Sequence, residues 1–477
     1  MSADEPAAES ADEPTAQSAA GPTAEPAADQ QAALLADPFG PLRSRDYLML
    51  LVLTAVFGVV LSAGAYGFLQ AVEHLQKVLY SSLPHALGLH HVPVWWPLPV
   101  LALGGLLVAL TVRYLPGNGG HQPAEGLKTK GAAPAAELPG ILLAAVASLA
   151  FGAVIGPEAP LIALGGGLAL YGFRLLRPGA PAPAQALVAA AGSFAAISAL
   201  LGSPLVGAFL LMEASGIGGP MLGIVLVPGL LAAGIGSLVF TGLGTWAGFG
   251  AGTLVIPSLP HVGRPDVAQF GYALVIGIAA AFLGTGIRRV ALRMQPGVNR
   301  RRTVWTPVAG LVVAGLAIAY TEGTGKDSSD VLFSGQSALP HLLLGTSTYS
   351  LGALVLLLAC KSLGYCVSLA AFRGGPIFPA LFLGAAGGIA LSHLPGLPFV
   401  PAAAMGMGAM AVALLRLPMT SVLLATLLLG LDGVSVMPLV IVAVVVCHVV
   451  SARLNPPRTE GATTPAAPAT SPSPSPA

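Results

Sequence analysis

The residue best placed to do chemistry is Glu158, in the segment Gly156–Pro160. It lies between two prolines, just before a long apolar run and far in sequence from any basic residue. An ionisable residue at membrane depth is costly and is a functional hypothesis by default. Ionised, this carboxylate can occupy an anion's site, and protonated it can leave. We therefore predict that Glu158 couples anion binding to a proton, with a carboxylate in a loop or among lipid headgroups as the alternative.

Three segments rich in glycine and proline flank apolar runs, namely Gly117–Pro123, Gly156–Pro160 and Gly374–Pro379. Each is placed to open a helix, and a helix N-terminus presents unpaired amides and the positive end of the helix dipole. Several such ends converging in a dry interior bind an anion without a buried cation. Glycine and proline content alone leaves ordinary loops or packing kinks as the alternative.

The composition is that of a membrane protein. Of 477 residues, 55% are hydrophobic and only 9% are charged, whereas soluble domains carry about 25% charged residues. This excludes an ordinary soluble enzyme, and a net charge of +1 offers no basic surface for nucleic acid. The 61 glycines and 42 prolines indicate closely packed, interrupted helices and disfavour a β-barrel.

The apolar runs between residues 43 and 455 predict an all-α polytopic membrane domain. Leu48–Val72 is long enough to cross a bilayer, which needs about 20 residues. Several later runs are shorter or broken, and such helices occur at membrane depth where they are buried or line a cavity. Basic clusters in the loops predict cytoplasmic termini, and the Lys326–Asp330 run is expected to be a solvated outer loop.

Both ends of the chain are predicted to be disordered. Residues 1–42 form an acidic leader with eight acids and no lysine or arginine, which leaves +9 on the rest of the chain. Residues 456–477 are a tail rich in proline and serine. Cys360, Cys366 and Cys447 lie in apolar stretches and are expected to be small core residues. No metal site and no cofactor is predicted.

An internal repeat divides the membrane domain. Gly192–Pro204 aligns with Gly406–Pro418 at a constant offset of 214, and Gly156–Pro160 resembles Gly374–Pro379 at a similar offset. Two matches in the same order favour duplication over chance, with halves at about 43–243 and 268–455. Duplicated halves with interrupted helices suggest a substrate site at their interface.

These motifs resemble those of the CLC family of chloride channels and chloride/proton antiporters. Gly156–Pro160 is similar to the family's G-(K/R)-E-G-P segment, which carries its gating glutamate, and Gly117–His121 is similar to G-S-G-I-P. Gly375–Pro379 is similar to G-x-F-x-P, and Gly202–Glu213 resembles the run that ends in the family's paired glutamates. Order and spacing match from about residue 47 to 453. The resemblance implies a helical homodimer in which each subunit has two oppositely oriented halves and one anion pathway.

The resemblance also implies an anion site made largely of backbone amides. It assigns anion binding to Asn118, Gly119, Ala159, Ile377 and Phe378. Asn118 replaces the family's coordinating serine, although its amide can still donate a hydrogen bond. Pro157 and Pro376 replace residues whose amides lie near the family's ion sites, and proline has no amide to donate.

Two departures concern the proton route and the inner gate. Glu213 matches the first of the family's paired glutamates, while the second, an internal proton-transfer residue in many antiporters, falls at Ala214. Glu213 is therefore a candidate for internal proton transfer, and a carboxylate at a helix end is the alternative. No tyrosine follows Tyr365, so the family's late inner-gate tyrosine is absent and another side chain must close the inner end, or that end is wider.

The sequence thus predicts a transporter and not an enzyme, with chloride, protons and the lipid bilayer as its partners. Proton-coupled chloride antiport gated by Glu158 is the preferred hypothesis. A passive chloride channel is the runner-up because of Ala214 and the missing tyrosine, and fluoride selectivity is a third hypothesis because of Asn118. A membrane scaffold without transport is disfavoured because it leaves Glu158 with no offsetting role. The expected location is the cell (plasma) membrane.

Overall fold

The computed structural model describes residues 43–89, 91–126, 131–216, 220–246, 256, 259–261, 263 and 265–455. The acidic leader and the tail predicted at the two ends lie outside these residues. Helices dominate the described chain, which holds no strand beyond one isolated bridge between Gly156 and Gly375. Nine of its helices are long and apolar enough to cross a membrane. The prediction of an all-α, multi-pass membrane protein is confirmed.

The helices fall into two sets that follow each other along the chain. The first set is α2 (Arg45–Lys77), α3 (Leu83–Ala86), α4 (Pro97–Tyr114), α5 (Leu138–Leu149), α6 (Glu158–Leu176), α7 (Ala182–Leu201), α8 (Pro204–Ser215) and α9 (Pro220–Trp246). The second set is α10 (Val267–Arg300), α11 (Arg302–Thr324), α12 (Ala338–Leu344), α13 (Leu351–Ala371), α14 (Ile377–Leu391), α15 (Phe399–Leu415), α16 (Pro418–Leu428) and α17 (Gly433–Leu454).

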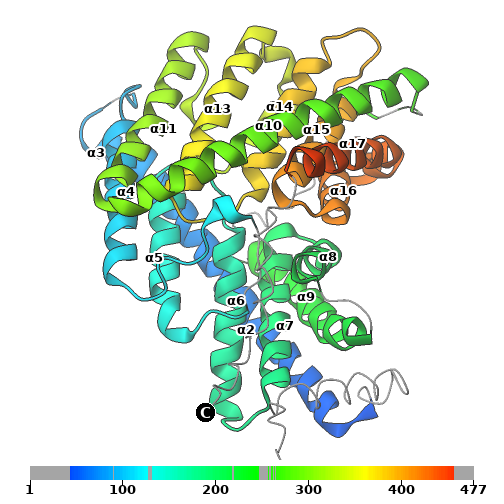
Figure 1. The fold of residues 1–477 in the computed structure, drawn as a ribbon. Coiled ribbons are helices and arrows are strands. Elements are labelled where there is room, and N and C mark those ends of the chain that lie inside the picture. Colours follow the sequence, from blue (N-terminus) through cyan, green and yellow to red (C-terminus); the bar gives the residue numbers. More distant parts are fainter. Residues whose placement is uncertain are drawn as a thin grey trace, which may run out of the picture.

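The packing of the first set is repeated in the second. α6 packs on α7 as α14 packs on α15, α2 packs on α9 as α10 packs on α17, and α7 packs on α9 as α15 packs on α17. In Figure 1 helices α5 to α9 fill the lower part of the view and α10 to α17 fill the upper part. α3 and α4 are exceptions in this view, and α4 packs against α11 of the second half. The duplication predicted from the sequence is therefore a structural repeat.

An equivalent pair of glycines makes a close helix crossing in each half. A Cβ atom on Gly165 would lie 2.3 Å from the carbonyl oxygen of Gly192, and one on Gly384 would lie 2.2 Å from that of Gly406. These crossings join α6 to α7 and α14 to α15. Small residues at a crossing let helix backbones approach closely, and dispersion contacts then hold helices together in a membrane. The crossings fix α6 and α14, whose N-termini form the site described below.

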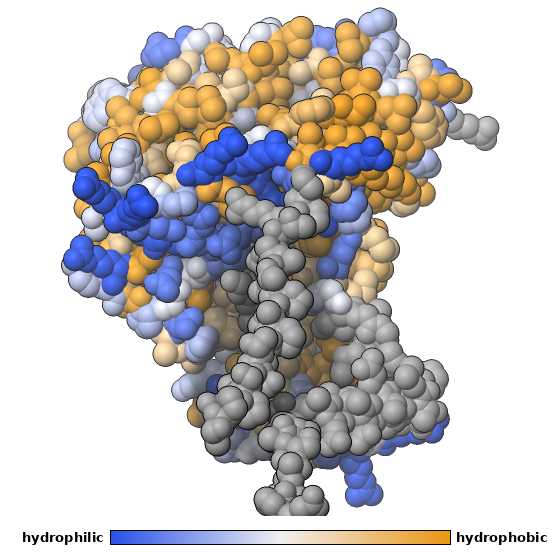
Figure 2. Space-filling model, in the orientation of Figure 1, coloured by the Kyte–Doolittle hydropathy of each residue, from blue (hydrophilic) through white to orange (hydrophobic). Residues whose placement is uncertain are grey.

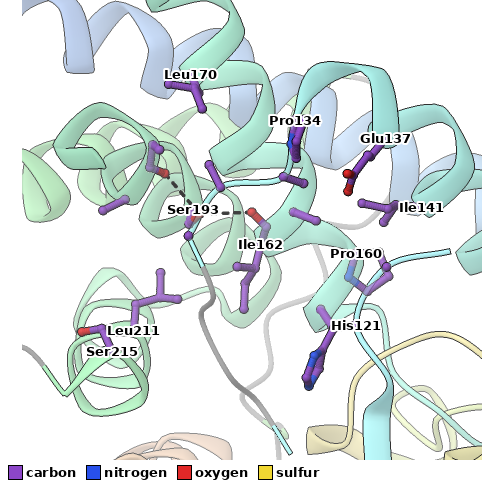
Figure 3. Close-up of a pocket in the computed structure, with 18 of the residues that line it drawn as sticks. His121, Pro134, Glu137, Ile141, Pro160, Ile162, Leu170, Ser193, Leu211 and Ser215 are labelled. Carbon is purple, nitrogen blue, oxygen red and sulfur yellow. Dashed lines mark hydrogen bonds between the residues drawn. The ribbon is translucent and has the colours of Figure 1, made fainter. Parts of the chain in front are cut away.

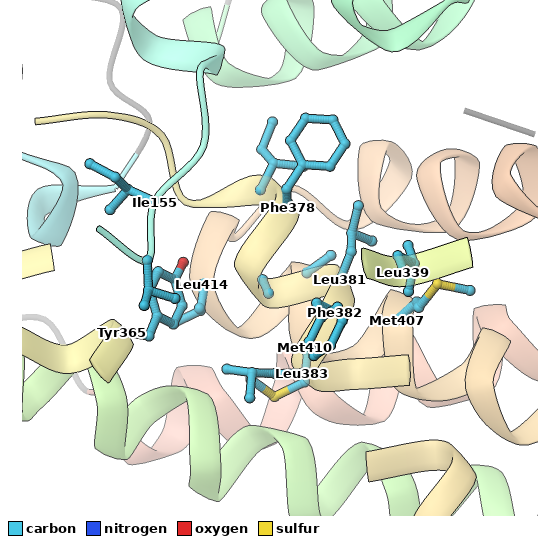
Figure 4. Packing of buried hydrophobic residues seen from close by; sticks show 14 of the residues in the cluster. Ile155, Leu339, Tyr365, Phe378, Leu381, Phe382, Leu383, Met407, Met410 and Leu414 are labelled. Atoms are coloured by element: carbon cyan, nitrogen blue, oxygen red, sulfur yellow. The ribbon is translucent and has the colours of Figure 1, made fainter. Parts of the chain in front are cut away.

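Helix α15 lies at the centre of the second half. Every residue from Val400 to Leu415 is buried, and the helix is apolar on all its faces, as expected for a helix surrounded by others. Figure 4 shows how Met407, Met410 and Leu414 pack near Phe382 and Leu383 of α14. α15 therefore packs closely along α14, the helix whose N-terminus contacts Glu158.

The outer surface is apolar where helices face outward. On α2 the side chains of Val52 and Val60 are 66% and 61% exposed, and on α10 Phe282 is 59% exposed. In Figure 2 hydrophobic residues cover much of the visible surface of the upper part, and a group of hydrophilic residues crosses the middle of the view. Exposed apolar faces of this extent suit contact with lipid tails.

The glycine crossing generates a stability prediction. Gly384→Ala is expected to lower the free energy of unfolding by about 2 kcal/mol, because the new methyl group meets the Gly406 backbone and forces α14 and α15 apart. Gly286→Ala is the matched control, since a Cβ there has no atom within 4 Å. Unfolding of both variants in mixed micelles measures the difference. Equal stability of the two variants would contradict the proposed constraint.

Candidate functional site

Glu158 is the first residue of α6 and is completely buried, and its carboxylate contacts the N-terminus of another helix. Its Oε1 accepts a hydrogen bond of 3.0 Å from the backbone amide of Phe378, in the first turn of α14. Its Oε2 accepts no hydrogen bond from the described residues. The carboxylate therefore sits at the N-terminus of α14 in the position that an anion would take, where amide groups and the helix dipole stabilise negative charge.

A short bridge between the two halves holds this geometry. The amide of Gly156 donates to the carbonyl of Gly375 over 2.7 Å, and the amide of Gly375 donates back to Gly156 over 2.6 Å. The bridge is antiparallel, so the segments that lead into α6 and α14 run in opposite directions. It places the two helix N-termini side by side.

Two serines brace the bridge in a reciprocal way. Ser368, near the end of α13, accepts a hydrogen bond from the amide of Val154, while Ser148, near the end of α5, accepts one from the amide of Arg373, both at 3.0 Å. Val154 and Arg373 each precede a bridging glycine by two residues. Each half therefore supplies a serine that fixes the helix-entry segment of the other.

The two bridging glycines make room for the carboxylate. A Cβ atom on Gly375 would lie 1.8 Å from Oε2 of Glu158, and one on Gly156 would lie 2.3 Å from the same atom. Any larger residue at either position would displace the Glu158 side chain. These glycines are thus required by the site itself rather than by backbone conformation.

Prolines limit the amides that α14 can offer. Pro376 and Pro379 have no N–H, so Ile377 and Phe378 supply the free amides of the first turn. Both residues are buried, and Glu158 already accepts from Phe378. Of the residues predicted to bind the anion, these two lie at the Glu158 carboxylate.

Tyr365 is a site residue that the sequence analysis missed. Its side chain is fully buried, and its hydroxyl donates a hydrogen bond of 2.7 Å to the carbonyl of Pro376, the residue just before α14. Figure 4 places the Tyr365 ring near Ile155 in the segment that precedes α6. A tyrosine in the middle of an apolar run, one helix before the Gly374–Pro379 segment, was the signal available in the sequence.

Asn118 and Gly119 lie in a turn rather than at the start of a long helix. Gly117, Asn118, Gly119 and Gly120 all have positive φ, between 51° and 87°, which explains why this segment consists of glycine and asparagine. The turn leads into one short 3₁₀ helix at Pro123–Glu125. The expectation that this segment opens a helix toward the anion is corrected to that extent.

A cavity of about 900 Å³ leads from this turn toward Glu158. Its wall includes Asn118, Gly119, Ala159, Pro160 and Gly374, so the sequence neighbours of Glu158 and Gly375 line it, although these two residues do not. Figure 3 shows His121 and Pro160 on one side of the cavity and Ser193, Leu211 and Ser215 on the other. The cavity brings together the predicted residues Asn118, Gly119 and Ala159.

Arg373 is a second residue that the sequence analysis missed. It lies two residues after the end of α13, lines the same cavity and is only 2% exposed. Its Nε donates to the carbonyl oxygen of Asn118 over 3.3 Å. Arg373 therefore puts a buried basic side chain on the cavity wall. A basic residue directly before a Gly-Gly-Pro segment was the overlooked signal.

Glu213 lies at the end of α8 and caps a different helix. Its Oε2 accepts hydrogen bonds from the amide and the hydroxyl of Thr420, at 2.9 and 2.7 Å, and its Oε1 accepts one of 3.1 Å from the amide of Met419. Both donors belong to the first turn of α16. A carboxylate at a helix N-terminus is stabilised by the dipole and by the amides that the helix leaves unpaired.

A polar network lies between α11, α13 and the Lys326–Asp330 run. Asp330 is 6% exposed, and its carboxylate accepts hydrogen bonds from Tyr320 at 2.9 Å and Tyr349 at 3.1 Å. Burial raises the pKa of the Asp330 carboxyl, and the two tyrosine hydrogen bonds oppose this shift. The expectation of a fully solvated outer loop is therefore wrong for Asp330.

Lys361 of α13 anchors the same loop from inside the protein. Its ammonium group is completely buried, donates to the carbonyls of Asp330, Val331 and Leu332 at 2.7 to 3.2 Å, and lies 4.3 Å from the ring centre of Phe382. Three acceptors match the three donors of an ammonium group. Lys361 thus ties the loop to α14, four residues beyond Phe378.

The chain is similar to known ion-transport proteins. Residues 100–452 match a family described as voltage gated chloride channel. The putative ion-transport protein YfeO of Salmonella schwarzengrund (strain CVM19633) is 31% identical over 362 residues, which cover 75% of this chain and 84% of that protein. YfeO of Salmonella newport (strain SL254) matches to the same extent.

Solved structures show the same fold. A slow cyanobacterial Cl⁻/H⁺ antiporter superposes with a TM-score of 0.69 at 20% identity, covering 85% of this chain and 94% of that one. A CLC-type fluoride/proton antiporter superposes with a TM-score of 0.64 at 18% identity, covering 85% of this chain and 95% of that one. At these identities the likeness concerns the fold alone.

The buried lysine generates a prediction about stability. Lys361→Met is expected to lower the free energy of unfolding by about 3 kcal/mol, because three buried carbonyls lose their donor. Lys77→Met is the control, since the Lys77 side chain is 67% exposed and pairs with Glu73 on the surface of α2. Unfolding in mixed micelles reports both changes. A loss for Lys361→Met no larger than for Lys77→Met would show that the network does not hold the loop.

Proposed function

The chain belongs to the voltage-gated chloride channel family, and we propose that it carries chloride across a membrane in exchange for protons, with Glu158 as both the gate and the proton carrier. Anion transport is the common activity of this family. The proton coupling, the choice of chloride and the role of Glu158 are the parts that we propose.

The observation that carries the proposal is the contact between Glu158 and α14. The Glu158 carboxylate accepts a hydrogen bond from the Phe378 amide at a helix N-terminus that would otherwise be free to bind an anion. Ionised carboxylate and chloride therefore compete for the same donors. Protonation removes the charge that the helix end attracts, so the side chain can leave and an anion can enter.

This competition yields an exchange cycle. An anion that reaches the Ile377 and Phe378 amides displaces the carboxylate, which takes up a proton where it meets water. When the anion departs, the carboxyl group loses its proton and returns to α14. The proton is taken up from the side to which the anion leaves and is released to the side from which the next anion enters, so the two ions cross the membrane in opposite directions.

Chloride is proposed as the transported anion, and the similar structures support the coupling to protons. One of them is described as a Cl⁻/H⁺ antiporter and another as a fluoride/proton antiporter. Fluoride is the second candidate because of Asn118. This residue stands where the family has a coordinating serine, and it lines the cavity near Glu158.

We further propose the assembly and the orientation. The protein is proposed to be a homodimer in the cell membrane, with both termini in the cytoplasm. The apolar outer faces of α2 and α10 support contact with lipid. Metal or cofactor chemistry has no part in the proposed cycle.

Glu213 has two candidate roles. Proton transfer from the inner side stays a prediction from the resemblance. Its three hydrogen bonds to Met419 and Thr420 support the alternative, in which it caps α16. The proposed cycle then requires that water reach Glu158 through the cavity beside Asn118.

Replacing the gate tests the proposed function directly. In proteoliposomes that report chloride and pH together, the wild type is expected to move protons against their gradient when a chloride gradient is imposed. Glu158→Gln is expected to reduce proton movement to the background leak while chloride flux continues and loses its pH dependence, because the amide cannot be ionised. Chloride flux in the wild type without proton movement would favour the passive channel. Unchanged pH dependence in the variant would reject Glu158 as the gate.

A second substitution separates the two roles of Glu213. Glu213→Gln keeps one acceptor oxygen but loses the charge at the α16 N-terminus, so a capping role predicts a loss of about 1 kcal/mol in stability and intact proton coupling. The same flux assay, together with thermal unfolding, reads both quantities. Loss of proton coupling with unchanged stability would assign Glu213 to the proton route instead.

A further inference from the structure

Arg373 carries hydrogen-bonding capacity that the proposed cycle does not use. Its Nε donates to the Asn118 carbonyl at 3.3 Å and its Nη1 donates to the Phe372 carbonyl at 3.2 Å. Its Nη2 is buried and has no hydrogen-bond partner among the described residues. A buried guanidinium group with an unused donor is costly unless another ligand completes its contacts.

No carboxylate of the described chain forms an ion pair with Arg373. Of the charged groups that act on it, Glu125 favours its positive charge and Arg302 opposes it. The side chain instead lines the cavity, together with Asn118 and Gly374. The Arg373 side chain therefore borders the space through which we propose that an anion approaches Glu158.

The internal repeat shows that the fold does not need this charge. Val154 occupies the equivalent place in the first half, two residues before the bridging glycine, and it is completely buried. Both residues donate their backbone amide to the serine of the opposite half. The bridge forms with Val154 in the first half and Arg373 in the second, so it does not require a charged side chain. The two halves differ at this position, where Arg373 lines the cavity.

We propose that the guanidinium group of Arg373 binds the transported anion in the cavity, as a waiting site next to the one that Glu158 occupies. The bound species is a small monovalent anion, and it completes the coordination of the unpartnered Nη2. Arg373 and Gly375 belong to one three-residue segment, and Gly375 contacts the Glu158 carboxylate. An anion bound at Arg373 would therefore lie close to the α14 N-terminus and could move there when the carboxylate leaves.

The inference rests on the proposed function, and it adds a cationic element to a path otherwise built from amides. Guanidinium donates hydrogen bonds in a fixed fork and keeps its charge, so it holds an anion more firmly than neutral donors do. The waiting site raises the local anion concentration beside the gate. Loss of the site should therefore weaken anion affinity more than it changes the maximal rate.

Substitution of Arg373 tests the waiting site. Arg373→Met is expected to raise the chloride concentration needed for half-maximal flux by about 10-fold, which corresponds to the loss of one charge-assisted hydrogen bond. Arg373→Lys keeps the charge and is expected to fall between the wild type and Arg373→Met. Arg177→Met removes one positive charge from the exposed end of α6 and is the control, expected to match the wild type.

The outcomes separate this inference from the function on which it rests. Absence of anion flux in the wild type would refute the proposed function. Normal wild-type flux with an unchanged half-maximal concentration in Arg373→Met would overturn the waiting site alone, as would equal losses in the Met and Lys variants. If neither variant folds, anomalous scattering from bromide in wild-type crystals decides. A peak in contact with the Arg373 guanidinium supports the proposal, and its absence at saturating bromide overturns it.

Discussion

The hydrogen bond between the Glu158 carboxylate and the Phe378 amide is the contact that the bridge, its serines and the glycine crossings position, and the proposed exchange depends on it. It places a side chain that begins one helix at the N-terminus of another, 220 residues further along the chain. That arrangement requires the Gly156–Gly375 bridge, the serines that brace it and the glycine crossings that position α6 and α14. It also makes the exchange of carboxylate for anion a local event, since both ligands use the same amides.

The two halves share their helix packing and the glycine and proline that precede α6 and α14, but they differ in the residues at and next to the carboxylate. Gly156 and Gly375 are equivalent, as are Pro157 and Pro376, which precede α6 and α14 with nearly the same backbone angles. Glu158, however, is matched by Ile377 in the second half. The carboxylate therefore comes from one repeat and its amide donors from the other. Arg373 opposite Val154 is a second departure at the same place.

Much of this arrangement could be predicted from the sequence, and the residues that escaped prediction share a physical cause. Apolar run length predicted the spans, and the recurrence of Gly192–Pro204 at Gly406–Pro418 predicted the repeat, because both depend on local pattern. The bond from Glu158 to Phe378, the cap that Glu213 places on α16 and the burial of Asp330 depend on contacts between segments distant in the chain. Arg373 and Lys361 were hidden for the same reason, since a lone basic residue does not reveal whether it faces solvent or a cavity.

The central claim is that Glu158 and the transported anion compete for the α14 N-terminus. Anomalous diffraction from bromide-soaked crystals of the wild type and of Glu158→Gln at neutral pH tests it most directly. The account predicts a bromide peak in contact with the Ile377 or Phe378 amide in the variant, whose neutral side chain is not held there, and no peak at that position in the wild type. A bromide peak at the same amides in the wild type, with Glu158 still bound to Phe378, would contradict it.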